Sequence, residues 1–157
     1  MWLPNNRGTR YSNVNDDNIT VGELPFFEMG LLDQKAFINK IVEETGIEDM
    51  TYIGYELGAS QMLFAMATDQ EGLIHDNKIA DHINRFIGIA PTFEIDTAGI
   101  EIDLSEISSI PVTLITSSDD TLVPAEDVEE LFDMIGYTDK NIWFMDGFSH
   151  DDFMGGK

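Results

Sequence analysis

Cysteine is absent from the 157 residues of this chain. The absence excludes disulfide bonds, thiol nucleophiles and zinc sites built from thiolates, and it leaves the cellular compartment open. Basic side chains are scarce: 8 lysines and arginines stand against 30 aspartates and glutamates, a net charge of -22. A field of that sign repels nucleic acids and anionic lipid surfaces, so we predict no nucleic-acid partner. A well-solvated surface, adaptation to high salt and a cationic partner are all compatible with this charge.

Long apolar runs are missing as well. No stretch approaches the roughly 20 residues that cross a bilayer, and the charged, apolar and small-residue regions of a signal peptide do not follow Met1. The sequence therefore predicts a soluble protein without a membrane span, while its localisation stays unknown. Its length and its 43% of hydrophobic residues predict one globular domain over residues 1–157 with a core of its own.

Apolar periodicity predicts alternating helices and strands. Helical spacing of apolar residues, or continuous apolarity over a helical length, predicts helices at 27–45, 57–69 and 124–135. Short apolar runs with β-branched or aromatic residues predict strands at 50–53, 83–90, 110–116 and 141–145. This alternation predicts an α/β fold with an open, mostly parallel sheet and flanking helices.

Two polar clusters contain residue types that can bind metal ions. Segment 13–18, rich in Asn and Asp, lacks the glycine and the distal Glu of an EF-hand loop, so no calcium is predicted there. His75 and His82, with Asp76 and Asp81 nearby, have a spacing that suits one helix face, but polar surface is the better interpretation. We therefore predict no metal and no other cofactor.

The strongest motif lies within 49–67. A short strand enters the pentapeptide 54–58, Gly-Tyr-Glu-Leu-Gly, and the chain leaves it as a helix, which is the arrangement of a nucleophile elbow. The glycines at both ends are expected to supply positive φ and to let the turn pack closely. Glu56 occupies the middle of the motif, where the nucleophilic serine of such an elbow stands.

Two further polar residues follow later strands. Asp120 and His150 are expected beside Glu56 at the carboxyl edge of the sheet, where ligands bind in this architecture. The order of elbow, acid and histidine is that of the α/β-hydrolase triad. Asp119 competes with Asp120 as the partner of the histidine. Ser60 lies one turn into the helix, so we expect it to pack there and not to act as a nucleophile.

Collinear motifs along nearly the whole chain resemble the acid lipase family of α/β hydrolases, which includes gastric and lysosomal lipases acting on triacylglycerols and cholesteryl esters. The matching segments are Trp2–Ser12, Phe27–Met29, Tyr52–Gly58, Ile89–Pro91, Asp120–Leu122 with Asp127–Val128, and Ser149–Phe153. The resemblance implies a partial α/β-hydrolase fold and a lipid or ester ligand. It also implies that Asp120 and His150 are the acid and base of the triad and that Leu57 donates its backbone N–H to an oxyanion. Members of this family are secreted or lysosomal.

The chain departs from the family pattern within the elbow. Glu56 replaces the catalytic Ser, Leu57 replaces a Gln, and Tyr55 replaces a His. Because the N–H of Leu57 belongs to the backbone, the change of side chain does not remove that donor. The nucleophile itself is absent.

Two larger segments of the family pattern are also missing. The family has a strand with the second oxyanion donor before its Trp-Leu motif, and the lipid-binding cap is reduced here to the acidic connector 94–109. We therefore expect an N-terminally truncated domain with no enclosed acyl pocket and an unpaired sheet edge at 50–53, which a protein partner would cover. A natural truncated paralogue, a fragment, and one half of an assembly completed by another chain remain open as explanations.

Two functional hypotheses follow. In the leading one, this lipase-like domain from a family of lipid metabolism is a pseudoenzyme that has lost hydrolysis and acts as a binding or assembly subunit. In the alternative, it is an active esterase or lipase-type hydrolase that uses Glu56 with His150 and Asp120. A glutamate is one methylene longer than an aspartate, so its oxygens would overshoot the reacting position, and this disfavours the alternative.

Overall fold

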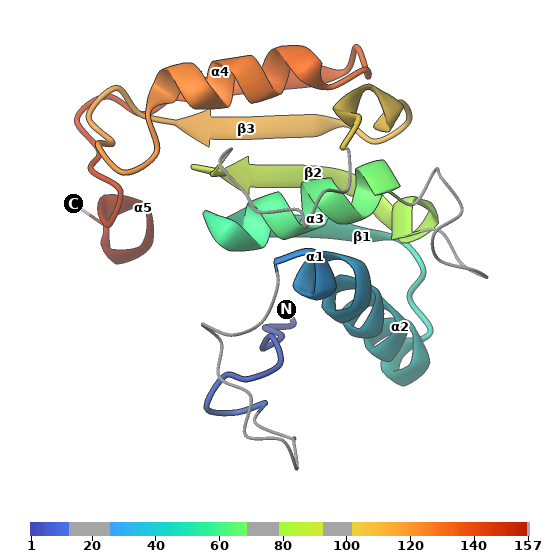
Figure 1. Cartoon of the computed structure of the whole chain (residues 1–157). Coiled ribbons are helices and arrows are strands. Elements are labelled where there is room, and N and C mark those ends of the chain that lie inside the picture. The colour runs from blue at the N-terminus through green and yellow to red at the C-terminus, as the bar shows by residue number, and fades with distance from the viewer. Residues whose placement is uncertain (13–25, 69–78, 93–101, 157) are drawn as a thin grey trace.

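The computed structural model describes residues 1–12, 26–68, 79–92 and 102–156, which are coloured in Figure 1. The Asn-rich segment 13–18, His75 with Asp76, and the connector up to residue 101 lie outside the described residues.

Four strands form one parallel sheet in the order β1-β2-β3-β4. They are β1 (Met50–Tyr55), β2 (Ile83–Ile89), β3 (Val112–Thr116) and β4 (Lys140–Phe144). The predicted α/β fold with a mostly parallel sheet is therefore confirmed. Within the described ranges β1 pairs with β2 alone, so β1 forms one edge of the sheet and β4 forms the other.

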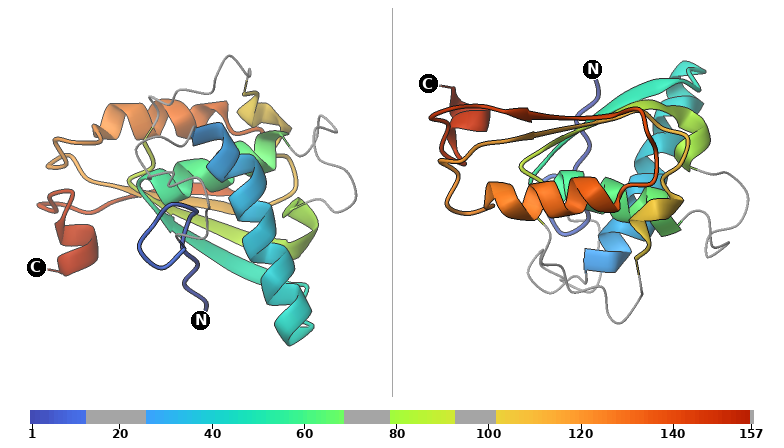
Figure 2. Two further views of the ribbon diagram at one scale, coloured as in Figure 1. Left: turned by 60° about the horizontal axis from the view of Figure 1, so that its bottom comes forward. Right: turned by 90° about the horizontal axis from the view of Figure 1, so that it is seen from above.

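The helical segments of the described residues alternate with these strands. They are α1 (Phe26–Glu28), η2 (Met29–Asp33), α2 (Gln34–Thr45), α3 (Leu57–Thr68), η4 (Ile79–His82), η5 (Leu104–Glu106), α4 (Ala125–Met134) and α5 (Asp152–Gly155). Figures 1 and 2 show α3 and α4 lying on the same face of the sheet, α3 over β1 and β2 and α4 beside β3. No helix in the described part of the chain combines the length and the apolar character that crossing a membrane requires.

The helix predicted over 27–45 contains a local widening. The segment η2 has the hydrogen bonding of a π-helix, and it joins α1 to α2. A Cβ atom at Gly30 in this turn would lie 2.7 Å from the ring of Phe64, so the glycine allows close packing against α3. The predicted end at Gly46 is confirmed, because its φ is 67° and its N–H donates to the carbonyl of Val42 over 2.8 Å.

The core lies between the sheet and the layer of α3 and α4. Every residue of α3 from Ala59 to Thr68 is buried, which explains the continuous apolarity of that segment. The largest fully buried apolar side chains include Met62, Phe64, Met66, Phe86, Leu114 and Ile135. The described half of the connector also contributes to this core, since Leu104 and Ile107 are buried.

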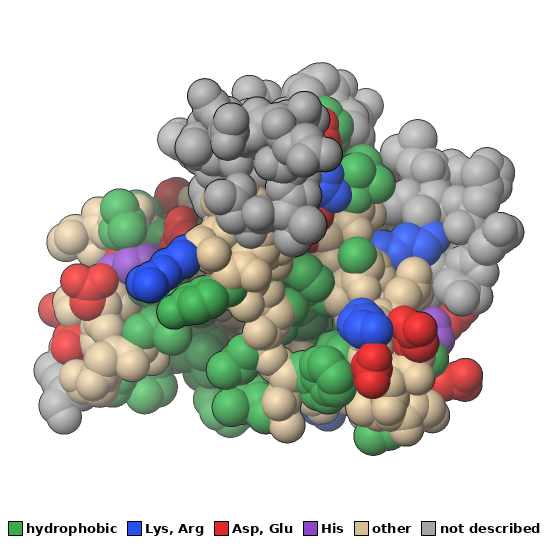
Figure 3. All heavy atoms as spheres, turned by 90° about the horizontal axis from the view of Figure 1, so that it is seen from below, with side chains coloured by type: hydrophobic (Ala, Val, Ile, Leu, Met, Phe, Trp, Pro, Cys, Tyr) green, Lys and Arg blue, Asp and Glu red, His purple; other side chains and the backbone are tan. Residues whose placement is uncertain are grey.

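The opposite face of the sheet carries exposed apolar side chains. Ile53 on β1 is 64% exposed and Trp143 on β4 is 60% exposed. Figure 3 views the molecule from below, the side on which α2 and the edge strand β1 lie, and hydrophobic side chains gather there in the middle and lower part of the surface, with acidic ones toward its two ends. The exposure of Ile53 and Trp143 shows that the described helices cover one face of the sheet better than the other.

Candidate active site

The chain turns sharply between β1 and α3 at Glu56. Because β1 ends at Tyr55 and α3 begins at Leu57, Glu56 makes this turn alone. Its φ of 49° lies in the left-handed region that side chains other than glycine rarely adopt. Its N–H donates to the carbonyl of Ile89 over 2.8 Å, and its own carbonyl accepts from the N–H of Ala59 at 3.0 Å. This is the geometry of a nucleophile elbow, with a glutamate at its tip.

The prediction that both glycines of the elbow supply positive φ is wrong. Neither Gly54 nor Gly58 has a positive φ, because Glu56 itself carries the left-handed conformation. A Cβ atom at Gly54 would lie 2.6 Å from the Cα atom of Ala59, whereas one at Gly58 would meet nothing within 4 Å. Only Gly54 is therefore needed for the close approach of β1 and α3.

Asp120 and His150 form a hydrogen-bonded pair. The Nδ1 atom of His150 lies 2.8 Å from Oδ2 of Asp120, whose side chain is fully buried, while the imidazole is 12% exposed. The other carboxylate oxygen accepts the N–H groups of Leu122 and Val123, both at 2.9 Å. With Oδ1 held by the backbone, Oδ2 is oriented to accept the Nδ1–H of the imidazole. A carboxylate in this position orients a histidine for proton transfer.

Asp119, the other carboxylate that the sequence offers as a partner for His150, binds a backbone N–H group instead. Its Oδ2 atom accepts the N–H of Gly147 over 2.9 Å, and the residue is exposed. This contact ties the loop after β3 to the loop after β4. Asp120, not Asp119, is therefore the residue that meets His150.

Tyr55 connects the elbow to the histidine. Its hydroxyl donates to the carbonyl of His150 over 3.1 Å, and the two rings lie 5.0 Å apart between centroids at an angle of 37°. Burial and the negative charges of Asp151, Asp120 and Glu56 raise the pKa of the Tyr55 hydroxyl, which therefore stays protonated and able to donate. The sequence marked Tyr55 only as a departure from the family pattern, because no local signal pairs it with a residue 95 positions later.

Ser60 and Leu57 lie in the first turns of α3. Ser60 is 2% exposed, and its hydroxyl is hydrogen-bonded to the carbonyl of Thr92 at 2.8 Å and to that of Glu56 at 3.2 Å. The prediction that Ser60 packs within the helix is therefore confirmed. Leu57 is the first residue of α3, where N–H groups lack intrahelical acceptors, and its role toward an oxyanion stays a prediction.

Buried amides anchor the N-terminal motif to the elbow helix. The Oε1 atom of Gln61 accepts the side-chain amides of Asn6 at 3.0 Å and Gln34 at 2.9 Å. The hydroxyl of Tyr52 lies 3.0 Å from Oε1 of Gln34 and 3.1 Å from the carbonyl of Gly58. This chain of contacts gives these amides a structural role and joins residue 6 to the first half of α3.

An ion pair supports the same attachment. The guanidinium of Arg7 is hydrogen-bonded to the buried Asp33 and lies 3.4 Å from a carboxylate oxygen of Glu28. The backbone N–H of Arg7 also donates to Asp33 over 3.0 Å. Asp33 is thus compensated by a charge and by a backbone donor, as a buried carboxylate requires.

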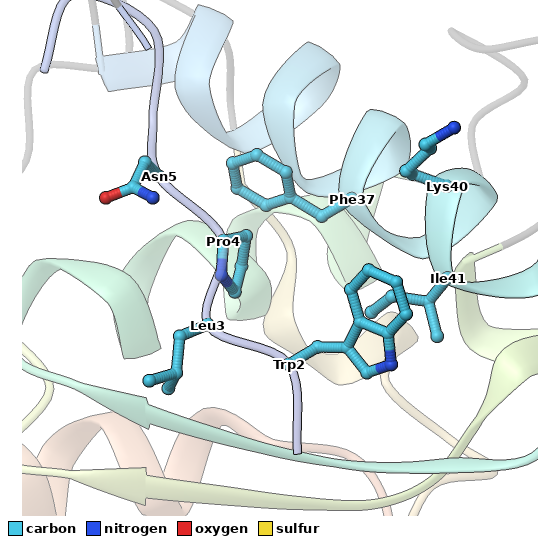
Figure 4. A pocket seen from close by; sticks show the side chains of 7 residues that line it. All are labelled: Trp2, Leu3, Pro4, Asn5, Phe37, Lys40 and Ile41. Carbon is cyan, nitrogen blue, oxygen red and sulfur yellow. The ribbon is translucent and has the colours of Figure 1, made fainter. Parts of the chain in front are cut away.

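A hollow of about 270 Å³ lies between the N-terminal segment and α2 (Figure 4). It is lined by Trp2, Leu3, Pro4, Asn5, Phe37, Lys40 and Ile41. None of these residues belongs to the elbow or to the pair of Asp120 and His150. Its one cation, Lys40, is engaged by Glu44 at 2.7 Å and by Glu43 at 3.3 Å.

The remaining histidine of the described residues is His82 in η4. Its Nδ1 atom lies 3.4 Å from the carbonyl of Glu48. Over the described ranges, no group of three or more His, Asp or Glu side chains is arranged to hold a metal ion.

No protein-family model matches the chain. Among curated proteins, the chain is similar to gastric triacylglycerol lipase of Rattus norvegicus, with 30% identity over 118 residues, which are 73% of this chain and 28% of that protein. It is also similar to lipase lipl-3 of Caenorhabditis elegans, with 32% identity over 95 residues, 58% of this chain and 22% of that protein. The chain thus spans about a quarter of the length of these curated relatives.

Solved structures share the fold at lower identity. Thermogutta terrifontis esterase 2 superposes with a TM-score of 0.67 at 18% identity, covering 88% of this chain and 60% of that one. An alpha-beta serine hydrolase homologue from Coxiella burnetii superposes with a TM-score of 0.61 at 22% identity. The superposition covers 95% of this chain and 60% of that one. The chain is therefore homologous, over the matched part, to lipases of the gastric and lysosomal type, and it has a partial α/β-hydrolase fold.

Proposed function

We propose that this lipase-like domain does not hydrolyse esters and acts as a binding or assembly subunit. The observation that carries the proposal is the identity of the elbow residue: Glu56, with its φ of 49°, stands where the lipase pattern has a serine. His150 could deprotonate a seryl hydroxyl at that place to make an alkoxide, but a carboxylate has no such proton to give. The acid and base of a triad are present without their nucleophile.

The length of the Glu56 side chain also disfavours catalysis. Glutamate has one methylene more than aspartate, and this displaces its oxygens from the position that an elbow prepares. These features support the loss of hydrolysis and leave the carboxyl edge as a place for a bound lipid or ester group.

The edge strand β1 supports the assembly part of the proposal. Residues Met50–Tyr55 contain no charged side chain, and Ile53 is 64% exposed. An uncharged edge with free N–H and C=O groups is a template for another strand. We assign to β1 a partner protein that adds a strand beside it and covers Ile53. Ile53→Lys should abolish stoichiometric association with that partner, while Lys40→Glu, on α2, should leave it unchanged.

The alternative is an active hydrolase, and the pair of Asp120 and His150 favours it. A carboxylate oxygen of Glu56 would attack the ester carbonyl carbon, and protonated His150 would give its proton to the departing alcohol. Water would then cleave the acyl-carboxyl anhydride, releasing the acid and restoring Glu56. The 2.8 Å contact between Asp120 and His150 is the geometry that such proton transfer needs.

Ester hydrolysis and active-site labelling distinguish the two. The purified chain should release no p-nitrophenol from short p-nitrophenyl esters above the buffer rate, and a fluorophosphonate probe should label no residue. Hydrolysis that disappears in both Glu56→Gln and His150→Ala would establish the alternative. Labelling traced to Ser60 would contradict the assignment of the elbow.

A further inference from the structure

Tyr55 contacts a residue from the far side of the sheet. β1 and β4 are the two edges of the described sheet, and His150 follows β4. The loop that carries His150 therefore runs back across the carboxyl edge to reach Tyr55 at the end of β1. We propose that Tyr55 is a positioning residue, which holds the imidazole of His150 at the elbow by binding its backbone and by packing against its ring.

Tyr55 makes two of the contacts that restrain His150, whose backbone carbonyl also accepts the N–H of Phe153 over 3.3 Å. Asp120 binds Nδ1 at 2.8 Å, the Tyr55 hydroxyl binds the backbone carbonyl at 3.1 Å, and the Tyr55 ring lies against the imidazole. A single hydrogen bond to Nδ1 leaves the imidazole free to rock about that bond. The backbone and ring contacts of Tyr55 remove this freedom and leave Nε2, which has no hydrogen-bond partner among the described residues, as the nitrogen available for chemistry.

The hydroxyl of Tyr55 is suited to this role because it stays protonated. Asp151, Asp120 and Glu56 all place negative charge near the phenol, so an additional phenolate charge is disfavoured. The phenol therefore donates to the carbonyl of His150 throughout the neutral pH range. Phenylalanine at this position would keep the ring contact and leave the carbonyl without that donor.

The loop of His150 has anchors that do not depend on Tyr55. The N–H of Gly147 donates to Asp119 at 2.9 Å, and the N–H and hydroxyl of Ser149 donate to Asp152 at 2.8 and 2.7 Å. The rings of Phe148 and Phe153 also pack together, with centroids 5.6 Å apart. We expect these contacts to preserve the conformation of the loop when Tyr55 is changed. Variants at Tyr55 therefore test the position of the imidazole and not the folding of the loop.

The tautomer of His150 is the direct readout. In long-range proton–nitrogen NMR spectra of protein labelled at its 3 histidines, His150→Gln identifies the signals of His150. We expect one tautomer in the wild type, with the proton on Nδ1 facing Asp120. Tyr55→Leu should convert this pattern into an averaged mixture of tautomers. Tyr55→Phe should shift the backbone carbonyl carbon of His150 and retain more of the single-tautomer pattern.

Tyr52→Phe is the matched control. It removes a hydroxyl from the same strand, but that hydroxyl contacts Gln34 and Gly58, so the His150 signals should stay unchanged. Wild-type His150 signals in folded Tyr55→Leu would overturn the proposal. If Tyr55→Leu fails to fold, Tyr55→Phe decides: an unshifted His150 carbonyl and an unchanged tautomer pattern overturn the proposal equally.

A catalytic readout rests on the proposed function. In protein where Glu56→Ser restores a hydroxyl, adding Tyr55→Leu should lower kcat for ester hydrolysis by up to about 10²-fold and leave KM unchanged, because a misplaced base affects the reaction and not substrate binding. If Glu56→Ser alone is inactive, the inherited triad fails as an explanation. The tautomer of His150 would still decide the role of Tyr55.

Discussion

The backbone of Gly54 lies against that of Ala59, so closely that a Cβ atom at position 54 would be 2.6 Å from Cα and 2.7 Å from the backbone nitrogen of Ala59. Backbone atoms cannot move aside as a flexible side chain does. β1 and α3 meet at this contact, and the turn at Glu56 depends on it. The contact makes position 54 the most sterically restricted part of the elbow.

Gly54→Ala should therefore destabilise the domain, by about 1 to 3 kcal/mol, the usual cost of overpacking. Gly58→Ala is the matched control, because a Cβ atom there meets nothing within 4 Å and α3 favours alanine over glycine. Urea denaturation measures both free energies of unfolding. Equal effects of the two substitutions would contradict the packing described for the elbow.

Lys140 at the start of β4 caps the C-terminus of α4 with its side chain. Its ammonium donates to the carbonyls of Phe132 at 2.7 Å and Ile135 at 2.8 Å, and it lies 4.6 Å from the centroid of the Phe132 ring. Lys140→Met keeps the aliphatic stem and removes these bonds, so it should lower the free energy of unfolding by about 1 to 3 kcal/mol.

Lys40→Met is the comparison for Lys140→Met. Lys40 pairs with Glu43 and Glu44 on the exposed side of α2, where solvent screens the charges, so its removal should change stability very little. Thermal unfolding of the two variants in the same buffer tests the contrast. A larger loss of stability for Lys40→Met than for Lys140→Met would contradict it.

Tyr52 should make the domain sensitive to alkaline pH. Burial raises the pKa of Tyr52 to about 12 in the folded protein, against an ordinary value of 10.0. As the pH rises, Tyr52 loses its proton in the unfolded chain at a lower pH than in the folded protein. The contribution of the protonated Tyr52 to the free energy of unfolding is therefore complete below about pH 10 and is lost as the pH rises toward about 12. The loss attributable to Tyr52 is on the order of 3 kcal/mol.

Denaturation of wild type and Tyr52→Phe between pH 8 and 12 checks this prediction. The variant should be less stable at pH 8, because it lacks the bonds to Gln34 and Gly58. It should then lose less stability than the wild type as the pH rises. Parallel curves across the whole range would show that Tyr52 does not titrate with folding.

Local sequence signals predicted the strands and the main helices of this fold. The four apolar runs became a parallel sheet, and Gly46 ended its helix, because burial and backbone conformation at these places depend on neighbouring residues. The sequence predicts the proximity of Asp120 and His150 for a related reason: parallel strands bring the loops after their carboxyl ends to one edge of the sheet. These features follow from periodicity and chain order.

Other features depend on contacts that have no local signal. The bond from Tyr55 to His150 spans 95 positions, and that from Asn6 to Gln61 spans 55. Propensity predicts positive φ at the glycines of the elbow because glycine is the usual left-handed residue, yet the packing of β1 on α3 imposes that conformation on Glu56. Tertiary packing, and not propensity, decides such positions.

We propose that Asp120 and His150 remain a working acid and base beside an elbow that lacks its nucleophile. Glu56→Ser should then restore slow ester hydrolysis, since His150 can take the seryl proton and Leu57 can donate one backbone N–H to the oxyanion. Among the described residues, Leu57 is the backbone donor that we identify at the elbow, and removing one oxyanion donor typically costs about 10² to 10³ in kcat, so recovery should be partial.

The decisive measurement compares p-nitrophenyl ester hydrolysis by folded Glu56→Ser with that by Glu56→Ser combined with His150→Ala. We expect measurable turnover in the first protein and a rate close to that of the unmodified chain in the second, because the seryl proton then has no acceptor. Equal rates in the two proteins would contradict the claim that His150 and Asp120 are poised to activate a nucleophile at position 56.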